Sequence, residues 1–426
     1  MLKIGASEDS YSLTDSIRIL QGQVNQMLSS LKKSTSENSK KLSNNNSFNT
    51  LKVLENRRSK HFNDFESEIR QNLVKMPNLQ CELKANQGVV SYYNSQTQLF
   101  GIYADQDTIL FFQEDQAYKN LVEAIENYRS CIEKDVKLDK STIQKYLTSG
   151  HALYRTLINP FANRLAHIDQ LVIIPDQLLD PIIFEALLSE EVKPTNYNFR
   201  NLPYLLKQAQ IVYSPSWKMY RANQRKNQKQ FTDQSIALWT NPKLLNSNGL
   251  EVLEQSIKVN FKNKYTLFNQ TKNGKAHFFH NHHKFDILHL LLHASSSQVN
   301  RHNNQIQFGN KAEEILYGFD LNQQQFQSKL LVLSSCESAT GTPQIGEGTF
   351  SLARSFINSG IPEVVAAQFL IPQTTTAPLL SYFYEFLAKG KTATSSLHLA
   401  KIKYLKNISS ERHAYPRFWA GMVIFN

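Results

Sequence analysis

From residue 232 to the C-terminus, short apolar runs alternate with amphipathic segments, and this alternation limits the folds open to the chain. The apolar runs predict strands over residues 235–239, 265–268, 286–292, 330–334, 363–369 and 419–425. The amphipathic segments predict helices over residues 250–261, 274–283, 348–359, 374–389 and 392–405. Strand–helix alternation predicts a mostly parallel sheet with helices on both faces. The uninterrupted apolar run Leu330–Leu333 is typical of a strand that is buried on both sides.

A second series of strands and helices precedes the first. Strand-like runs at 89–93, 99–103 and 108–112 predict a β-meander, and two or three helices follow over residues 115–166. Compact apolar strands are predicted at 171–174 and 211–213. The first of these strands ends in Pro175-Asp176, with neither Cys nor His. We interpret this half as a degenerate copy of the C-terminal half, and we expect the two to pack as one unit.

The N-terminal segment differs in composition from both halves. Residues 16–28 and 51–74 have helical periodicity, whereas residues 29–49 are almost entirely Ser, Lys and Asn and predict a flexible linker. The basic stretch 221–229 predicts an exposed linker between the halves. The expected organisation is therefore a helical segment with its linker at 1–80, a first α/β subdomain at 81–230 and a second at 231–426.

Composition narrows the class of protein. The 426 residues include three widely spaced cysteines, which fit neither a disulfide framework nor a zinc pattern and are typical of a reducing compartment such as the cytoplasm. No signal peptide and no apolar run of membrane-spanning length is visible. The net charge of +11 raises the possibility of a polyanion, but the basic cluster at 221–229 holds no aromatic residue for base stacking. We expect neither a membrane nor a nucleic acid as partner.

Two of the predicted strands end in reactive side chains. The run 285–292 leads directly to His293, and the run 329–334 leads to Cys336, each followed by small or polar residues. Active sites of open α/β sheets gather at the carboxyl ends of the strands. If the two strands are neighbours, the imidazole and the thiol meet at one edge, where the base can generate a thiolate. The histidine precedes the cysteine by 43 residues, close to the order and spacing of caspases.

Each residue also has a simpler interpretation. Free cysteine is a common core residue, and a single histidine at the end of a strand is often structural. Because both residues occur in this order at two strand ends, the sequence pattern favours a catalytic pair about as strongly as it favours two structural residues.

An ordered series of motifs resembles the CHAT family, a caspase-like module often found beside tetratricopeptide repeats. Besides the two strand ends, the matching segments lie at 153–157, 171–176, 184–187, 213–216, 346–348, 352–356, 360, 389–391, 397–400 and 418–423. The resemblance runs from about residue 88 to the end of the chain. It implies a caspase-like three-layer α/β/α fold, in which a pseudo-caspase half is followed by a half that bears the dyad.

The resemblance also implies roles for individual residues. His293 would be the base and Cys336 the nucleophile, and the backbone N–H groups of Ala294 and Cys336 would form the oxyanion hole. No cofactor and no metal is implied. The chain departs from the family pattern at Ala294, where Gly is frequent, and at Ser335, where Ala is frequent. Phe369 and Gln373 stand near the places of a usual Trp and an acidic residue, which leaves the preference for the substrate residue open.

A histidine-rich segment offers a rival site. His277, His280, His282, His283 and His289 could in principle bind a metal, but Asp286 is the single carboxylate nearby. We interpret the segment as a solvated helix end. His289 and His293 are four residues apart on one predicted strand, so we expect them to share one face, with His289 in a supporting or packing role.

The expected function is that of a caspase-like cysteine endopeptidase that cleaves protein substrates through a thioester. A regulatory protein partner is expected as well, because the usual repeat array is absent or vestigial. The alternative is a catalytically inactive scaffold or signalling module that keeps the fold.

Overall fold

The computed structural model describes residues 80–426 except 81, 96, 115–117, 134–137, 177, 196, 227–230, 232, 241–247, 270–272, 296–304, 310, 335–346 and 370. The expected helices at 16–28 and 51–74, and the linker between them, lie outside the described residues. In the described part of the chain, no helix combines the length and the apolar character needed to cross a bilayer.

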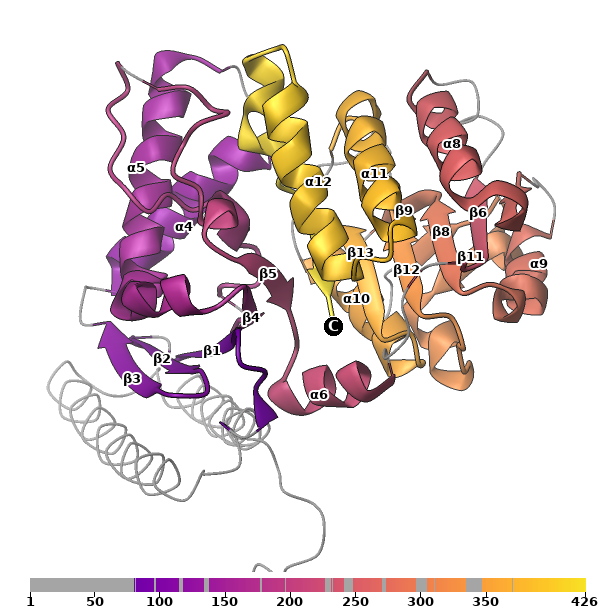
Figure 1. Ribbon diagram of the computed structural model, residues 1–426, viewed down its shortest axis with the longest axis horizontal. Helices are drawn as coiled ribbons and strands as arrows, with labels where there is room; N and C mark the ends of the chain where they lie inside the picture. The colour runs from indigo at the N-terminus through magenta and orange to yellow at the C-terminus, as the bar shows by residue number, and fades with distance from the viewer. Residues whose placement is uncertain are drawn as a thin grey trace, which may run out of the picture.

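The described strands form one large sheet and one small sheet (Figure 1). Along the chain they are β1 (Gln87–Asn94), β2 (Leu99–Ala104), β3 (Ile109–Glu114), β4 (Gln170–Ile174), β5 (Gln210–Tyr213), β6 (Ile236–Thr240), β7 (Tyr265–Phe268), β8 (Ile287–Leu291), β9 (His293–Ser295), β10 (Gln305–Gln307), β11 (Ile315–Tyr317), β12 (Leu330–Leu333), β13 (Glu363–Ala367) and β14 (Met422–Phe425). The large sheet has the order β3-β2-β1-β4-β5-β14-β13-β12-β8-β6-β7, and the small sheet has the order β11-β10-β9.

Apart from β2 and β3, which continue from β1 as an antiparallel meander at one edge, the large sheet consists of two parallel sets that run in opposite directions. Strands β1, β4, β5 and β14 are parallel to one another, and so are β13, β12, β8, β6 and β7. The sets meet where β14 pairs antiparallel with β13. The last strand of the chain therefore lies in the middle of the sheet and joins the two expected halves, which share one continuous hydrophobic core.

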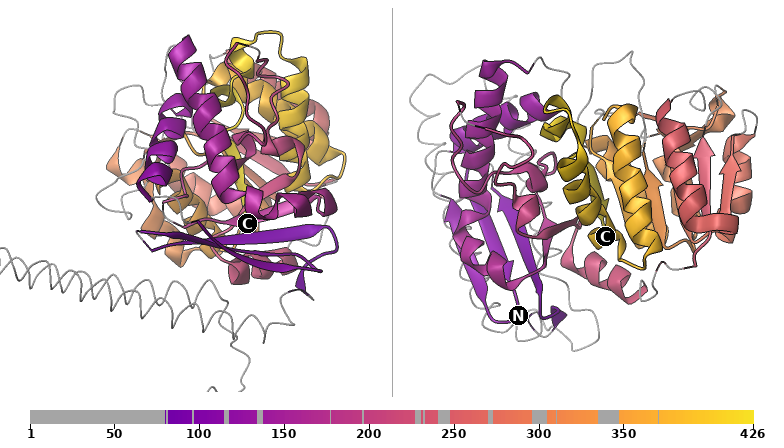
Figure 2. Two further views of the ribbon diagram at one scale, coloured as in Figure 1. Left: turned by 90° about the vertical axis from the view of Figure 1, so that its left-hand side faces the viewer. Right: turned by 45° about the horizontal axis from the view of Figure 1, so that its top comes forward.

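Helices cover the sheet. They are α4 (Tyr118–Ile132), α5 (Lys140–Leu157), α6 (Trp217–Lys226), α8 (Asn248–Phe261), α9 (Gly274–Asn281), α10 (Glu347–Asn358), α11 (Gln373–Ala388) and α12 (Ala393–Asn407). Figure 1 shows α12, α11 and α8 side by side across one face, and the right-hand view of Figure 2 shows the same row. Helix α8 connects β6 to β7, toward the β7 edge of the sheet, whereas α9 connects β7 to β8 and α10 connects β12 to β13, both away from that edge. Because connections between parallel strands are right-handed, α9 and α10 lie on the face opposite to α8. The expected α/β fold with three layers is confirmed.

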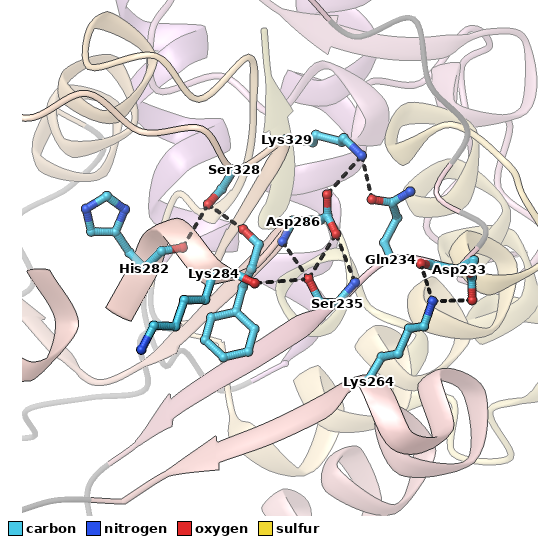
Figure 3. Close-up of polar contacts among 10 residues, drawn as sticks. Asp233, Gln234, Ser235, Lys264, His282, Lys284, Asp286, Ser328 and Lys329 are labelled. Carbon is cyan, nitrogen blue, oxygen red and sulfur yellow. Dashed lines mark hydrogen bonds and ion pairs between the residues drawn. The ribbon is translucent and has the colours of Figure 1, made fainter. Parts of the chain in front are cut away.

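A polar network at the amino ends of β6, β8 and β12 fixes their relative register (Figure 3). The Asp286 carboxylate accepts from the Ser235 backbone N–H at 3.0 Å and from the Ser235 hydroxyl at 2.9 Å, and it forms an ion pair of 2.9 Å with Lys329. Partial burial acts to raise the pKa of Asp286, but the hydrogen bonds from Lys329 and Ser235 outweigh burial and hold it below its ordinary value. On the other side, the Ser328 hydroxyl donates to the Phe285 carbonyl at 2.8 Å.

The basic stretch at 221–229 is not simply an exposed linker. Its first six residues belong to α6, which the sequence prediction missed. The helix is anchored by Trp217 and Tyr220, which are 8% and 1% exposed and stack on each other. The Tyr220 hydroxyl accepts a hydrogen bond of 2.6 Å from Gln87 of β1. Two aromatic side chains thus bind a strongly basic helix to the protein, although most of its other side chains are polar.

Candidate functional site

His293 begins the small sheet, two residues after Leu291, the last residue of β8. It pairs with Gln307 of β10, and β10 pairs in turn with β11. The His293 side chain is half-buried, and its Nδ1 is buried without a hydrogen-bond partner among the described residues. The ring nitrogen is therefore not engaged by the part of the site that the structure describes.

Ala294, the expected oxyanion-hole residue after the histidine, lies in β9 opposite Ile306. Its backbone is extended, and it is not among the described non-glycine residues with a positive φ angle, which are Asp233, Lys262 and Asn273. Because any residue adopts an extended backbone, alanine is compatible with a position where the family often has glycine.

Cys336 and Ser335 lie outside the described residues, so the structure does not test the dyad. Strand β12, which leads to them, is described. It is the direct neighbour of β8, with Leu330 opposite Ile287 and Leu333 opposite Leu290. The condition set in the sequence analysis, that these two apolar strands are neighbours, is thus met. The structure describes Ser334, the residue after β12, and its backbone N–H donates to the Leu290 carbonyl at 3.2 Å.

A buried polar chain crosses the sheet at this end. His289, at the centre of β8, is 0% exposed, and its Nε2 lies 2.5 Å from the Ser334 hydroxyl oxygen. On its other side, the His289 Nδ1 lies 2.8 Å from the hydroxyl of Tyr384 on α11. Burial lowers the pKa of His289 to about 3 and raises that of Tyr384 well above its usual value, so both side chains are neutral at physiological pH. In the sequence, this series of hydrogen bonds is indicated by His289, the single polar residue in an apolar strand.

The expectation that His289 and His293 share one face of one strand is wrong. The chain leaves the large sheet at Leu292, and the two histidines belong to different sheets. The physical reason is the pairing of His293 with β10, which directs the backbone away from the line of β8. His289 lies in the core within β8, as expected for a packing or supporting residue.

The histidine-rich segment forms α9 and the 3₁₀ turn at His282–Lys284. His280 and His283 are exposed, in agreement with a solvated helix end. His282 is not, because its ring packs on Phe326 with centroids 4.3 Å apart and is only 5% exposed. Among the described residues, no group of three or more His, Cys, Asp and Glu side chains is arranged to hold a metal ion.

The end of β13 contacts a segment of the first half. The Gln368 backbone N–H donates to the Gly421 carbonyl at 2.9 Å, and the Gln368 amide lies 3.5 Å from the carbonyl of Asp180. The Asp180 carboxylate is in turn 3.8 Å from the Arg354 guanidinium of α10. Phe369, which stands near the place of the family's usual tryptophan, packs so close to Gly421 that a Cβ there would lie 2.7 Å from its ring. Sequence reasoning did not identify Gln368, Asp180 or Arg354.

A hollow of about 340 Å³ lies between α4 and α5, lined by Asn120, Glu123, Ala124, Asn127, Lys145, Thr148, Ser149 and Ala152. These helices belong to the first half of the molecule, so the hollow is separate from the strand ends that carry His293.

Of the three thiols, the structure describes Cys131. It is 2% exposed, and burial raises its pKa, which disfavours the reactive thiolate.

Comparison with solved structures shows the type of fold. The chain is similar to a separase–securin complex of Saccharomyces cerevisiae solved at 2.6 Å, with a TM-score of 0.53, 9% identity and coverage of 85% of this chain and 31% of that chain. It is also similar to the Arg-specific cysteine proteinase gingipain R, with a TM-score of 0.39, 9% identity and coverage of 72% and 73% of the two chains. The protein thus spans about a third of the separase chain, and the fold is caspase-like.

Sequence comparison places the protein in a family. A search of curated proteins gives no match. The family model of the CHAT domain matches residues 147–426, so its match begins later than the resemblance noted from residue 88. This match covers well over half of the chain, and the protein belongs to the CHAT domain family.

Proposed function

We propose that this protein is a cysteine endopeptidase in which His293 is the base and Cys336 the nucleophile. The caspase-like fold and membership of the CHAT family support the proposal. The substrate would be a peptide bond of another protein, and no metal or organic cofactor would take part.

One observation carries the proposal, the register of β8 and β12. Leu330 pairs with Ile287 and Leu333 with Leu290, so the paired residues are 43 positions apart, and Cys336 follows His293 by the same 43 positions. Since paired residues of parallel strands reach the same edge of a sheet together, the register supports a thiol and an imidazole at one edge. The unengaged Nδ1 of His293 agrees with a ring nitrogen that faces a group outside the described residues.

The chemistry follows from these groups. His293 takes the proton of the Cys336 thiol, and the thiolate attacks the carbonyl carbon of the peptide bond. The backbone N–H groups of Ala294 and Cys336 stabilise the resulting oxyanion. The C–N bond then breaks, the amine leaves with the proton from His293, and a thioester remains. Water, deprotonated by His293, hydrolyses the thioester and restores the thiol.

We extend the proposal to a regulatory protein partner. The support is the composition of the segments after the two residues, 295–310 and 339–345, which are rich in polar and small side chains. The first segment is not entirely a loop, because it contains β10 at Gln305–Gln307. A partner that binds one arrangement of these segments would raise activity by population shift.

The test is the reaction of the native full-length protein with iodoacetamide, followed by mass-spectrometric mapping of the labelled cysteines. We expect Cys336 to react at pH 7 at least about tenfold faster than Cys131, since a thiolate paired with a histidine is present well below the usual thiol pKa of about 8.5. His293→Ala should lower the alkylation rate of Cys336 itself at pH 7 by about tenfold, whereas His280→Ala, a change at an exposed histidine of α9, should leave that rate unchanged.

Cleavage of a peptide library, with and without cell extract, completes the test. Activity that is lost in Cys336→Ala and retained in EDTA would support the metal-free mechanism. Stimulation by extract would support the partner. Equal labelling of all cysteines, together with no cleavage under either condition, would favour the non-catalytic scaffold.

A further inference from the structure

The His289 side chain is an unusual occupant of its position. Strand β8 is otherwise apolar and fully buried, and a leucine at 289 would fill the space without any polar group to satisfy. The imidazole is retained with both nitrogens engaged, at 2.5 Å from Ser334 Oγ and 2.8 Å from the Tyr384 hydroxyl. A neutral imidazole has one donor and one acceptor nitrogen, so either tautomer satisfies both contacts. Such a satisfied polar chain in a core calls for an explanation other than packing.

The position of Ser334 supplies that explanation. Ser334 is 1% exposed, follows the last residue of β12 and stands two residues before Cys336. Its backbone is bound to β8 through the Leu290 carbonyl, and its hydroxyl is bound to β8 through His289. Tyr384 on α11 holds the histidine from the other side. The Tyr384 hydroxyl, the His289 imidazole and the Ser334 hydroxyl therefore form one hydrogen-bonded series, which ends at the residue from which the backbone continues to the cysteine.

We propose that His289 and Tyr384 are positioning residues for Cys336, and that they act by fixing Ser334, the residue from which the backbone continues to the nucleophile. This inference rests on the proposed function. The two residues do not exchange protons with a substrate, because both are buried and the two nitrogens of His289 are already engaged within the core.

The position of Cys336 depends on how firmly Ser334 is held, because the two residues are close in sequence. Cys336 follows Ser334 by only two residues, so any rotation of the backbone at Ser334 is passed on to the position of the thiol. A misplacement of about 1 Å in a catalytic group is enough to lower a rate by about a hundredfold. Holding Ser334 by its hydroxyl as well as by its backbone N–H removes such a rotation.

The experiment compares two variants of the full-length protein, Ser334→Ala and Tyr384→Phe, with matched controls. Ser328→Ala removes a hydroxyl of equal burial at the opposite end of β12, where Ser328 donates to the Phe285 carbonyl. Tyr404→Phe removes the hydroxyl of a buried tyrosine of α12 that donates to the His413 carbonyl at 3.2 Å. For each protein, the rate of Cys336 alkylation by iodoacetamide is measured from pH 5 to 9, together with the thermal unfolding midpoint.

We expect Ser334→Ala and Tyr384→Phe to lower the alkylation rate at pH 7 by about tenfold. Their pH profiles should shift toward that of an ordinary thiol, with a midpoint of about 8.5. The two controls should keep the wild-type profile despite a comparable loss of stability. A role in stability alone would affect all four variants alike, so the shift in pH profile separates positioning from packing.

Two outcomes would overturn the inference in different ways. If Ser334→Ala and Tyr384→Phe are folded and keep the wild-type alkylation profile, the positioning role is wrong and the dyad stands. If Cys336 of the wild type reacts no faster than it does in urea, the dyad is wrong, and the positioning role falls with it. If Ser334→Ala does not fold, Tyr384→Phe decides, since it removes a single oxygen atom.

Discussion

Lys401 and Glu185 form a buried ion pair between the two halves of the molecule. The Lys401 Nζ on α12 lies 2.7 Å from Glu185 Oε1 in the 3₁₀ turn Phe184–Ala186, and the two side chains are 1% and 4% exposed. The Tyr213 hydroxyl donates to the second carboxylate oxygen at 2.6 Å, and Lys401 also donates to the Ala420 carbonyl at 3.3 Å. Burial lowers the pKa of Lys401, and the neighbouring Glu185 only partly offsets this effect. The pair thus joins two residues that are 216 positions apart in the sequence.

We predict that Lys401→Met lowers the free energy of unfolding by about 3–5 kcal/mol, because it leaves the Glu185 carboxylate buried without its cation. The measurement is urea unfolding at pH 7. The double variant Lys401→Met/Glu185→Gln should regain most of the loss, since it removes the uncompensated charge. A matched control is Lys389→Met, which breaks an ion pair whose side chains are 59% and 29% exposed and should cost less than about 1 kcal/mol. A double variant that is no more stable than Lys401→Met would contradict this account.

Two glycines should respond in opposite directions to alanine. At Gly421, an added Cβ would lie 2.7 Å from the Phe369 ring and 2.9 Å from Ile371, so we predict that Gly421→Ala destabilises the protein by about 1–3 kcal/mol. At Gly150, within α5, the nearest atoms would be 3.5 Å away or more, and Gly150→Ala should stabilise the helix by about 0.5–1 kcal/mol. Thermal unfolding of the two variants checks the pair of predictions, and a neutral Gly421→Ala would show that Phe369 can move at no cost.

Acid should destabilise the protein partly through His282. Burial lowers the pKa of His282 to about 4, against about 6.5 in the unfolded chain. Below pH 6.5 the unfolded state therefore binds a proton that the folded state does not, and stability falls as the pH decreases toward 4. His289 and His398, with pKa values lowered to about 3 and about 4, act in the same direction.

We predict that His282→Phe, which keeps a ring against Phe326, makes the stability less dependent on pH between 6.5 and 4. The slope of the unfolding free energy should decrease by up to about 1.4 kcal/mol per pH unit, the value for one proton. Urea unfolding at several pH values measures the slope. Parallel curves for the wild type and the variant would be inconsistent with a neutral, buried His282.

The sequence by itself determined the elements whose pattern is local. The predicted strand at 265–268 is β7, and the apolar runs at 287–291 and 330–333 are the centres of predicted strands. Burial of a strand on both faces requires apolar residues at consecutive positions, so the pattern is visible without a partner strand. The short strand β10 and helix α6 were missed, because two of the three residues of β10 and most of those of α6 are polar, and the structure of polar segments depends on what they pair with or pack against.

Only the tertiary structure decided which residues meet across the sheet. The central place of β14, the antiparallel contact between the two parallel sets and the pair Lys401–Glu185 depend on segments far apart in sequence. The same holds for His289, which contacts Ser334, 45 positions later in the sequence, and Tyr384, 95 positions later. The sequence marked His289 as a polar residue in an apolar strand, but a hydrogen bond needs a partner at a defined distance. Folding of β12 and α11 against β8 provides those partners.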